Sequence, residues 1–170
     1  MVVADMKKNI YIFLDIDGVL NTVGQWKHPY SLNDACIAAF DEYVHSLPTN
    51  DFKIILTSSW KSGFDFSGNH TPQIRELVDK LAAYGLSIIS KTENIGDDRA
   101  EEINDYIRKH HLEQYQCIVV DDDPGIFRSK LLDNCKMLWI DAKTGFTANK
   151  KPYGPQRILR AIIEKIKPVE

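Results

Sequence analysis

Short runs of apolar residues recur along the chain and predict five buried strands. The first run, residues 10–14, contains no polar residue, which is typical of a strand covered on both faces. Similar runs follow at residues 52–56, 86–89, 117–120 and 137–140. Each run is short, and turn-forming residues separate it from the next segment, so the pattern favours strands over helices.

Segments with a helical spacing of apolar residues lie between these runs. They predict helices over residues 35–44, 72–84, 99–107, 126–132 and 157–166. Candidate N-caps precede three of them: Ser31 or Asn33, Thr71, and Asp97 or Asp98. Residues 61–71 and 141–153 are predicted loops, and residues 1–8 a flexible extension. The chain is therefore expected to alternate strands with helices.

Alternation of this kind predicts a parallel sheet, because parallel strands need crossover connections. A length of 170 residues and an apolar content of 44% suit one domain with a sizeable core. No repeat, low-complexity tract or linker divides the chain. We therefore expect one doubly wound, Rossmann-like α/β domain across residues 1–170, with a five-stranded parallel sheet.

Charge and cysteine content narrow the class of protein. The net charge of −3 gives no general basic field for nucleic acid, although it leaves room for a local basic groove. The three cysteines form no C-x-x-C motif, and disulfides are not expected. No apolar stretch is long enough to span a membrane, so no membrane partner is predicted. A reducing, cytoplasmic setting fits these features best.

The first strand runs directly into two carboxylates and a glycine. Asp15 and Asp17 would face the same side if the strand continued, because side chains repeat every second residue. Gly18 permits a bend, so the strand is expected to end there. Two like charges at the end of a buried strand repel each other unless a cation or hydrogen bonds offset the cost. Taken alone, the segment is equally explained as an Asp-Gly turn.

Other strands end in polar residues as well. In open parallel sheets, ligands bind beyond the carboxyl ends of the strands, near the point where the strand order reverses. Three strands carry candidate side chains at that edge: Asp15 and Asp17, Thr57 and Ser58, and Asp121 and Asp122. Their joint arrival at one edge favours a functional site over turn chemistry.

The order of these residues resembles the haloacid dehalogenase-like (HAD) superfamily. The D-x-D-G-V-L-N segment at residues 15–21 matches its first motif, and the hydroxyls after residue 56, a basic residue and the acidic pair follow in order. Residues 57–60, 99–103 and 140–147 are similar to the small HAD domains of Swiss Army knife RNA-repair proteins. The resemblance covers nearly the whole chain and implies a phosphatase with a phospho-aspartyl intermediate.

The resemblance implies a role for each carboxylate. Asp15 is expected to be the nucleophile, and Asp17 the general acid and base. Mg²⁺ is expected on Asp15, the main-chain carbonyl of Asp17 and Asp122, with water completing the shell. Asp121 is expected to orient this shell or the basic residue.

The remaining candidates would contact the phosphate. Thr57 or Ser58 is expected to donate a hydrogen bond to it, with Thr57 preferred. Arg99 and Lys91 compete for the basic position, which usually carries lysine in this superfamily. Arg99 ranks first because it begins a predicted helix, where its charge and the helix N-terminus both favour an anion.

The expected substrate follows from the short connections. About forty residues separate Asp17 from Thr57, and the crossover helix and strand occupy most of them. The loop at residues 61–71 is also too short for a cap domain. An open site suits a phosphate on a nucleic-acid end, a nucleotide or a phosphoprotein, and no obligate protein partner is indicated. Two interpretations remain for Trp26 and Trp60: each could contact the substrate or pack against the protein.

Two other classes of protein compete with a phosphatase. A phosphoacceptor receiver module also gathers acidic residues, a hydroxyl and a lysine on a parallel sheet. Its acidic pair follows the first strand, however, whereas here Asp121 and Asp122 follow the fourth predicted strand. The other alternative is a catalytically idle, metal-binding interaction domain. The presence of a suitable residue at every position that the chemistry needs argues against it.

Overall fold

The computed structural model describes residues 9–28 and 31–148. The predicted extension at residues 1–8 and the predicted helix at 157–166 lie outside the described residues. No helix within the described ranges is long and apolar enough to cross a membrane.

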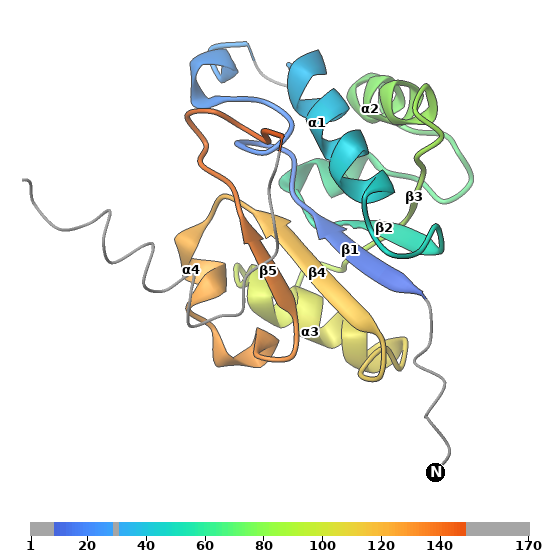
Figure 1. Cartoon of the computed structure of the whole chain (residues 1–170), viewed down its shortest axis with the longest axis vertical. Helices are drawn as coiled ribbons and strands as arrows, with labels where there is room; N and C mark the ends of the chain where they lie inside the picture. The colour runs from blue at the N-terminus through green and yellow to red at the C-terminus, as the bar shows by residue number, and fades with distance from the viewer. Residues whose placement is uncertain (1–8, 29–30, 149–170) are drawn as a thin grey trace, which may run out of the picture.

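Five parallel strands form one sheet in the order β3-β2-β1-β4-β5 (Figure 1). They are β1 (Ile10–Leu14), β2 (Phe52–Leu56), β3 (Ile88–Lys91), β4 (Gln116–Asp121) and β5 (Lys136–Trp139). The predicted five-stranded parallel sheet is confirmed, and no cap domain interrupts the described residues. The strand order reverses between β1 and β4, so the carboxyl ends of these two neighbours mark the expected binding edge.

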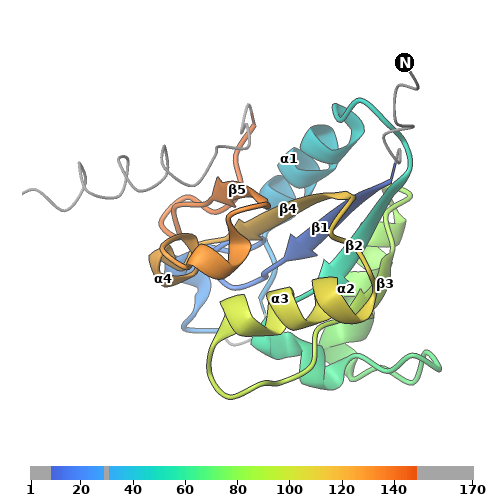
Figure 2. The same cartoon turned by 90° about the horizontal axis from the view of Figure 1, so that it is seen from below.

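Helices cover both faces of the sheet. The helices α1 (Asp34–His45) and α2 (Pro72–Ala82) pack on one face, and α3 (Arg99–Lys109) and α4 (Pro124–Phe127) on the other. Figure 2 shows α1 and α3 on opposite sides of the sheet. Strand residues alternate between the two cores: Ile12 and Leu14 join the first, and Phe13 joins the second. This double burial explains why the strands are apolar at successive positions.

Local capping chemistry sets the helix starts. The Asn33 carboxamide accepts hydrogen bonds from the first-turn N–H groups of α1, and the Asp98 carboxylate does the same for α3. These residues, rather than Ser31 and Asp97, are the N-caps. Thr71 occupies the N-cap position of α2, where Pro72 begins the helix. The cap at Asp98 places Arg99 in the first turn of α3, beside the sheet edge.

The third strand begins two residues later than predicted. The N–H of Leu86 donates to the Leu81 carbonyl at the end of α2, across Gly85 at a φ of +74°. Leu86 is buried in the first core by this turn, not by strand pairing. As a result β3 extends to Lys91, beyond the predicted end of the strand at residue 89.

Two other segments differ from the predicted pattern. The expected helix at residues 126–132 is split into α4 and a 3₁₀ turn, η3 (Lys130–Leu132), because Ser129 caps a new turn. The expected loop after residue 60 begins with a 3₁₀ turn, η2 (Ser59–Gly63). A further 3₁₀ turn, η1 (Val23–Gln25), follows the first strand. The turns η1 and η2 follow β1 and β2 at the edge where these strands end, whereas η3 precedes β5 at the other edge.

Candidate active site

Three carboxylates meet at the carboxyl ends of β1 and β4. Asp15, Asp121 and Asp122 each offer an oxygen, and these oxygens lie within 4.8 Å of one another. The two strands remain paired up to this point, since the N–H of Asp15 donates to the Val120 carbonyl at 3.0 Å. The predicted convergence of distant acidic residues at one edge of the sheet is thus observed.

Arg99 joins two of these carboxylates. Its Nη1 atom lies 3.1 Å from Asp15 Oδ1 and 2.8 Å from Asp121 Oδ2. Burial by itself lowers the pKa of the guanidinium, but the two carboxylates raise it well above its usual value. Arg99 is therefore a permanent positive charge within the cluster, at the start of α3.

Burial raises the pKa of all three carboxyl groups and so disfavours their joint ionisation. Burial raises the pKa of Asp15 well above its usual value, and the nearby Asp121 carboxylate raises it further. Burial likewise raises the pKa of Asp121 from its ordinary 3.8 to about 6, against the opposing charge of Arg99. The pKa of Asp122 is raised by burial as well. A cation in the cluster would stabilise the ionised forms.

The donor set fits a divalent cation. Three ionised carboxylates and one guanidinium carry a net charge of −3 + 1 = −2, which a divalent ion neutralises. Carboxylate oxygens are the ligands that Mg²⁺ prefers in proteins. Asp121 is the least available of the three, because its Oδ2 binds Arg99 and its Oδ1 accepts from the Asp123 N–H at 2.9 Å.

Gly18 is required where the chain turns past Asp122. Its φ is +78°, a left-handed conformation that side chains rarely adopt. A Cβ built on Gly18 would also overlap the Asp122 carboxylate. The glycine of the D-x-D-G motif therefore lets the first loop approach the second pair of carboxylates closely.

Asp17 lies apart from the ionic cluster. Its Oδ1 accepts from Asn21 Nδ2 at 2.9 Å, and its Oδ2 accepts from Trp60 Nε1 at 3.0 Å. Its side chain is half-buried, and its carboxylate is not among the clustered oxygens within the described ranges. The expected metal contact through its main-chain carbonyl stays a prediction.

Asn21 organises the loop around Asp17. Its Oδ1 accepts from the Gly18 N–H at 2.8 Å and from Trp26 Nε1 at 3.1 Å. Its Nδ2 donates to the Ser31 carbonyl as well as to Asp17. The amide is thus fully engaged and buried. Sequence reasoning missed Asn21 as a site residue, although an Asn in a turn four residues after an Asp is a recognisable signal.

The two hydroxyls after β2 have different surroundings. Thr57 Oγ1 is buried and has no hydrogen-bond partner among the described residues, while its N–H donates to the Leu14 carbonyl. Ser58 Oγ instead accepts from the Trp60 N–H and caps η2. A buried, unpaired hydroxyl needs a partner from a ligand or water. This difference favours Thr57 over Ser58 as the phosphate contact.

The structure does not bring Lys91 to the carboxylates. Its Nζ donates to the main-chain carbonyls of Lys61 at 3.0 Å and Phe64 at 2.6 Å. Lys91 therefore ties the segment after η2 to the end of β3. Of the two candidates for the basic position, Arg99 is the one that lies in the cluster.

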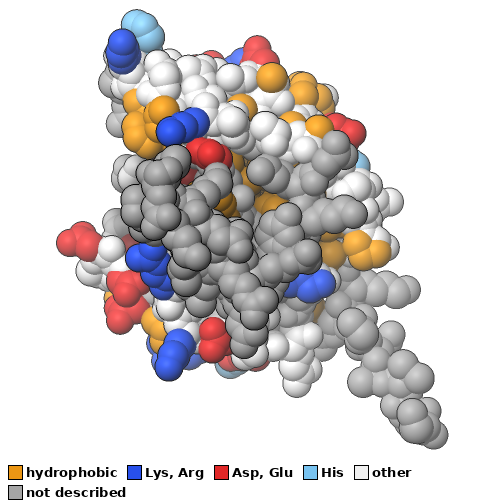
Figure 3. All heavy atoms as spheres, turned by 60° about the vertical axis from the view of Figure 1, so that its left-hand side comes forward, with side chains coloured by type: hydrophobic (Ala, Val, Ile, Leu, Met, Phe, Trp, Pro, Cys, Tyr) orange, Lys and Arg blue, Asp and Glu red, His pale blue; other side chains and the backbone are white. Residues whose placement is uncertain are grey.

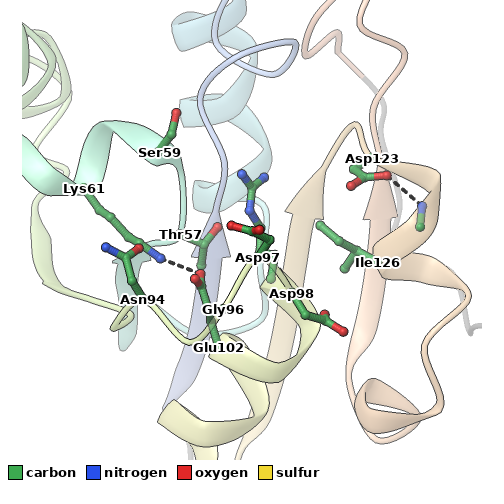
Figure 4. Close-up of a pocket in the computed structure, with 12 residues that line it drawn as sticks. Thr57, Ser59, Lys61, Asn94, Gly96, Asp97, Asp98, Glu102, Asp123 and Ile126 are labelled. Atoms are coloured by element: carbon green, nitrogen blue, oxygen red, sulfur yellow. Dashed lines mark hydrogen bonds and ion pairs between the residues drawn. The ribbon is translucent and has the colours of Figure 1, made fainter.

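A cavity of about 510 Å³ opens beside Thr57 and Arg99 (Figure 4). A buried ion pair between Lys61 and Glu102 lines it, and Lys61 Nζ also donates to Thr92 Oγ1 at 3.1 Å. Glu102 additionally accepts from the Ile95 N–H, so the pair joins η2, the loop before α3 and α3 itself. Sequence reasoning missed this pair, since its members are 41 residues apart.

The strand order argues against a receiver module. Receiver domains have the flavodoxin-like order 2-1-3-4-5. This sheet has the order 3-2-1-4-5, with the carboxylate cluster at the junction of β1 and β4. The fold is HAD-like.

Comparison with known families identifies the group more narrowly. Residues 11–150 match the family described as the HAD domain in Swiss Army Knife RNA repair proteins. The chain belongs to this family. Searches of curated proteins and of solved structures returned no match to the chain.

Proposed function

We propose that this protein is a Mg²⁺-dependent phosphomonoester hydrolase that works through a phospho-aspartyl intermediate. The observation that supports it most is the convergence of Asp15, Asp121 and Asp122 around Arg99, next to the unpaired hydroxyl of Thr57. Phosphoryl transfer needs a positioned nucleophile and positive charge on the phosphate oxygens, and this arrangement supplies both.

The metal would lie on the Asp15 and Asp122 side of the cluster. Asp15, Asp122 and the main-chain carbonyl of Asp17 would hold it, and Asp121 would orient Arg99. When bound, Mg²⁺ neutralises charge on the phosphate and allows a carboxylate to approach it. The remaining chemistry belongs to the side chains of the protein.

Two displacements complete the reaction. In the first, a carboxylate oxygen of Asp15 forms a bond to phosphorus while the bond from phosphorus to the leaving oxygen breaks, and Asp17 donates a proton to that oxygen. In the second, Asp17 takes a proton from water, whose oxygen bonds to phosphorus as the acyl phosphate bond breaks. Inorganic phosphate leaves and the Asp15 carboxylate is restored. Thr57 and Arg99 donate hydrogen bonds to the phosphate oxygens throughout.

A phosphate at the end of a nucleic acid is the substrate that we favour. The site is not covered by an inserted cap within the described residues, and the matching family is that of HAD domains in RNA repair proteins. Acidic and basic side chains are interspersed on the face shown in Figure 3. Recognition of such a substrate would therefore depend on local contacts at the site rather than on a general basic field.

The test is a phosphatase screen with and without Mg²⁺. The substrates are p-nitrophenyl phosphate, nucleotides, 3′- and 5′-phosphorylated oligonucleotides and phosphopeptides. Turnover should require Mg²⁺, and Asp15→Asn should lower kcat by more than about 10³-fold, because the nucleophile is lost. The matched control is Asp133→Asn, which changes an exposed aspartate directly after η3 and should retain activity.

Three results would contradict the proposal. Turnover in Asp15→Asn equal to that of the wild type would show that Asp15 is not the nucleophile. Phosphate taken from a small donor and released slowly would indicate a phosphoacceptor. Binding of Mg²⁺ without any turnover on the whole screen would instead favour an idle interaction domain.

A further inference from the structure

A second cavity, of about 480 Å³, adjoins the first. The two share Lys61 and Asn94 as lining residues. The rest of the second wall comes from the end of β3, the loop after η2 and the outer side of α3. Nothing in the chemistry proposed for the carboxylate site uses this space.

The second cavity lies one strand further along the sheet edge. The N–H of Thr92 donates to the Leu56 carbonyl at 3.1 Å, so the end of β3 is level with the end of β2. Thr57 follows β2 directly, and Thr92 lines the second cavity. Neighbouring strands are about 4.8 Å apart. A group attached to a phosphate at Thr57 can therefore extend into the second cavity.

One wall carries an exposed aromatic side chain on a structured turn. Phe66 is 68% exposed, although it is a large apolar residue. Its turn is held by Ser67 Oγ, which donates to Asp65 Oδ2 at 2.6 Å, and by the Asp65 N–H, which donates to His70 Nδ1 at 3.0 Å. Lys91 Nζ lies 5.9 Å from the centre of the Phe66 ring. The turn therefore presents the ring to the cavity while its backbone is fixed.

A second part of the lining, on α3, is also aromatic. On α3, the Tyr106 and His110 rings stack with a centroid distance of 4.0 Å and an interplanar angle of 24°. The lining of the second cavity therefore offers ring side chains from two elements, the turn that carries Phe66 and α3. Aromatic surfaces of this kind bind nucleobases with little dependence on sequence.

The two cavities differ in the charges that line them. The first has Lys61 and Arg99 against four carboxylates (Asp97, Asp98, Glu102 and Asp123), a balance of 2 − 4 = −2. The second has Lys61, Lys91 and Lys109 against Glu93 and Asp105, a balance of 3 − 2 = +1 with His110 neutral. Of the two, the second is the more favourable for the anionic backbone next to a base.

We propose that the second cavity is a nucleobase subsite, in which a base of the phosphorylated terminus stacks on Phe66. This inference rests on the proposed phosphatase function and extends it to the substrate. Lys91 acts as a positioning residue, because it anchors the carbonyl of Phe64 at the start of the turn.

The test compares substrates that differ only in their bases. One is a diadenosine dinucleotide that carries the terminal phosphate, 3′ or 5′, which the wild type removes faster. The other is the same phosphorylated backbone without bases. The variants are Phe66→Ala, Phe66→Trp, and Tyr84→Ala as a control. Tyr84 is exposed and follows α2, whose apolar side packs on the other face of the sheet from α3.

The kcat/KM of the wild type should be about tenfold or more higher for the base-bearing dinucleotide, as expected for one stacked base. The difference should come from a lower KM. Phe66→Ala should abolish this preference and leave the rates on the baseless substrate and on p-nitrophenyl phosphate unchanged. Phe66→Trp and Tyr84→Ala should keep the preference.

Several outcomes would overturn the subsite while leaving the phosphatase intact. The first is that the wild type hydrolyses the two substrates at equal rates, and the second is that Phe66→Ala keeps the preference in full. The third is that Phe66→Ala loses activity equally on every substrate. The fourth is that the wild type hydrolyses a phosphopeptide faster than the dinucleotide. If the wild type does not hydrolyse p-nitrophenyl phosphate, the proposed function fails by itself. Calorimetric titration with adenosine 5′-monophosphate then decides the subsite, since binding must occur and must weaken about tenfold in Phe66→Ala.

Discussion

Asp15 and Asp17 follow the same strand, two residues apart, but lie in opposite surroundings. Asp15 is 3% exposed and shares the cluster with two other carboxylates and the Arg99 guanidinium. Asp17 is half-buried and accepts hydrogen bonds from the uncharged donors of Asn21 and Trp60. The first region is ionic and the second is neutral and polar.

The difference suggests how one motif divides two tasks. A carboxylate in an ionic cluster is positioned by charge and is suited to share a cation. A carboxylate held by neutral N–H groups can gain or lose a proton without breaking an ion pair. The neighbouring environment, more than the residue type, therefore separates the proposed nucleophile from the proposed acid and base.

The sharpest test of this division is Asp17→Asn. The loss of general acid and base catalysis should lower kcat by about 10²–10⁴-fold. The rise in thermal stability on addition of Mg²⁺ should stay as in the wild type, because the proposed metal contact of Asp17 is through its main-chain carbonyl alone. Normal turnover in this variant would refute the proton-transfer role.

The next largest effect is expected at Arg99. Arg99→Met should lower kcat/KM by about 10²–10³-fold, because a charge aimed at the phosphate oxygens is lost. Arg99→Lys should recover little of this loss, since an ammonium on a shorter side chain lacks the fixed donor geometry of the guanidinium. The control is Arg108→Met, a mostly exposed arginine near the end of α3. Equal activity in Arg99→Met and Arg108→Met would contradict the assignment.

A smaller effect should separate the donors around Asp17. Trp60→Phe keeps the buried ring but removes the N–H that binds Asp17 Oδ2. A hydrogen bond to a charged group contributes about 1.5 kcal/mol or more, so kcat should fall about tenfold or more. Trp26→Phe should have less effect, because Trp26 contacts Asn21 and not Asp17. Steady-state kinetics of both variants would check this order, and the reverse order would count against it.

The smallest effect concerns pH and the ionic region. Burial first, and the neighbouring carboxylates second, raise the pKa of Asp15, and burial raises that of Asp121 to about 6. A carboxyl whose pKa is raised on folding holds its proton more tightly in the folded state. Its contribution to stability is therefore present at about pH 4 and is lost as the pH rises through about 6.

Added Mg²⁺ should reverse this loss, because it binds the ionised carboxylates. The increase in Tm produced by Mg²⁺ should thus be larger at pH 7.5 than at pH 5, and Asp122→Asn should reduce it at pH 7.5. Thermal melts of both proteins at the two pH values provide the measurement. An increase in Tm that does not depend on pH would contradict the metal site.

Local patterns predicted most of the fold. Apolar runs and helix caps gave four of the five strands to within about one residue, and the D-x-D-G segment marked the edge where the carboxylates meet. The start of β3 was missed because the turn after α2, and not strand pairing, buries Leu86. The prediction of one helix over residues 126–132 was wrong, because apolar spacing alone does not reveal a new cap at Ser129.

Trp60 and Lys61 have partners far away in the chain. Trp60 binds Asp17 across 43 residues, and Lys61 binds Glu102 across 41. Each looks ordinary in its own segment, as a tryptophan or lysine after a strand. Their roles follow from the sheet order, which brings the end of β2 between the first and third strands.

The amino-acid sequence by itself determined the order of strands and helices and the presence of a carboxylate motif, because these depend on near neighbours. Only the tertiary structure decided which basic residue joins the carboxylates and which hydroxyl stays unpaired. Arg99 reaches Asp15 because α3 begins at the sheet edge, whereas the extension of β3 directs Lys91 to main-chain carbonyls. Thr57 Oγ1 has no hydrogen-bond partner among the described residues, whereas Ser58 Oγ caps η2. Both outcomes depend on which elements are adjacent in space, a property that no single segment carries.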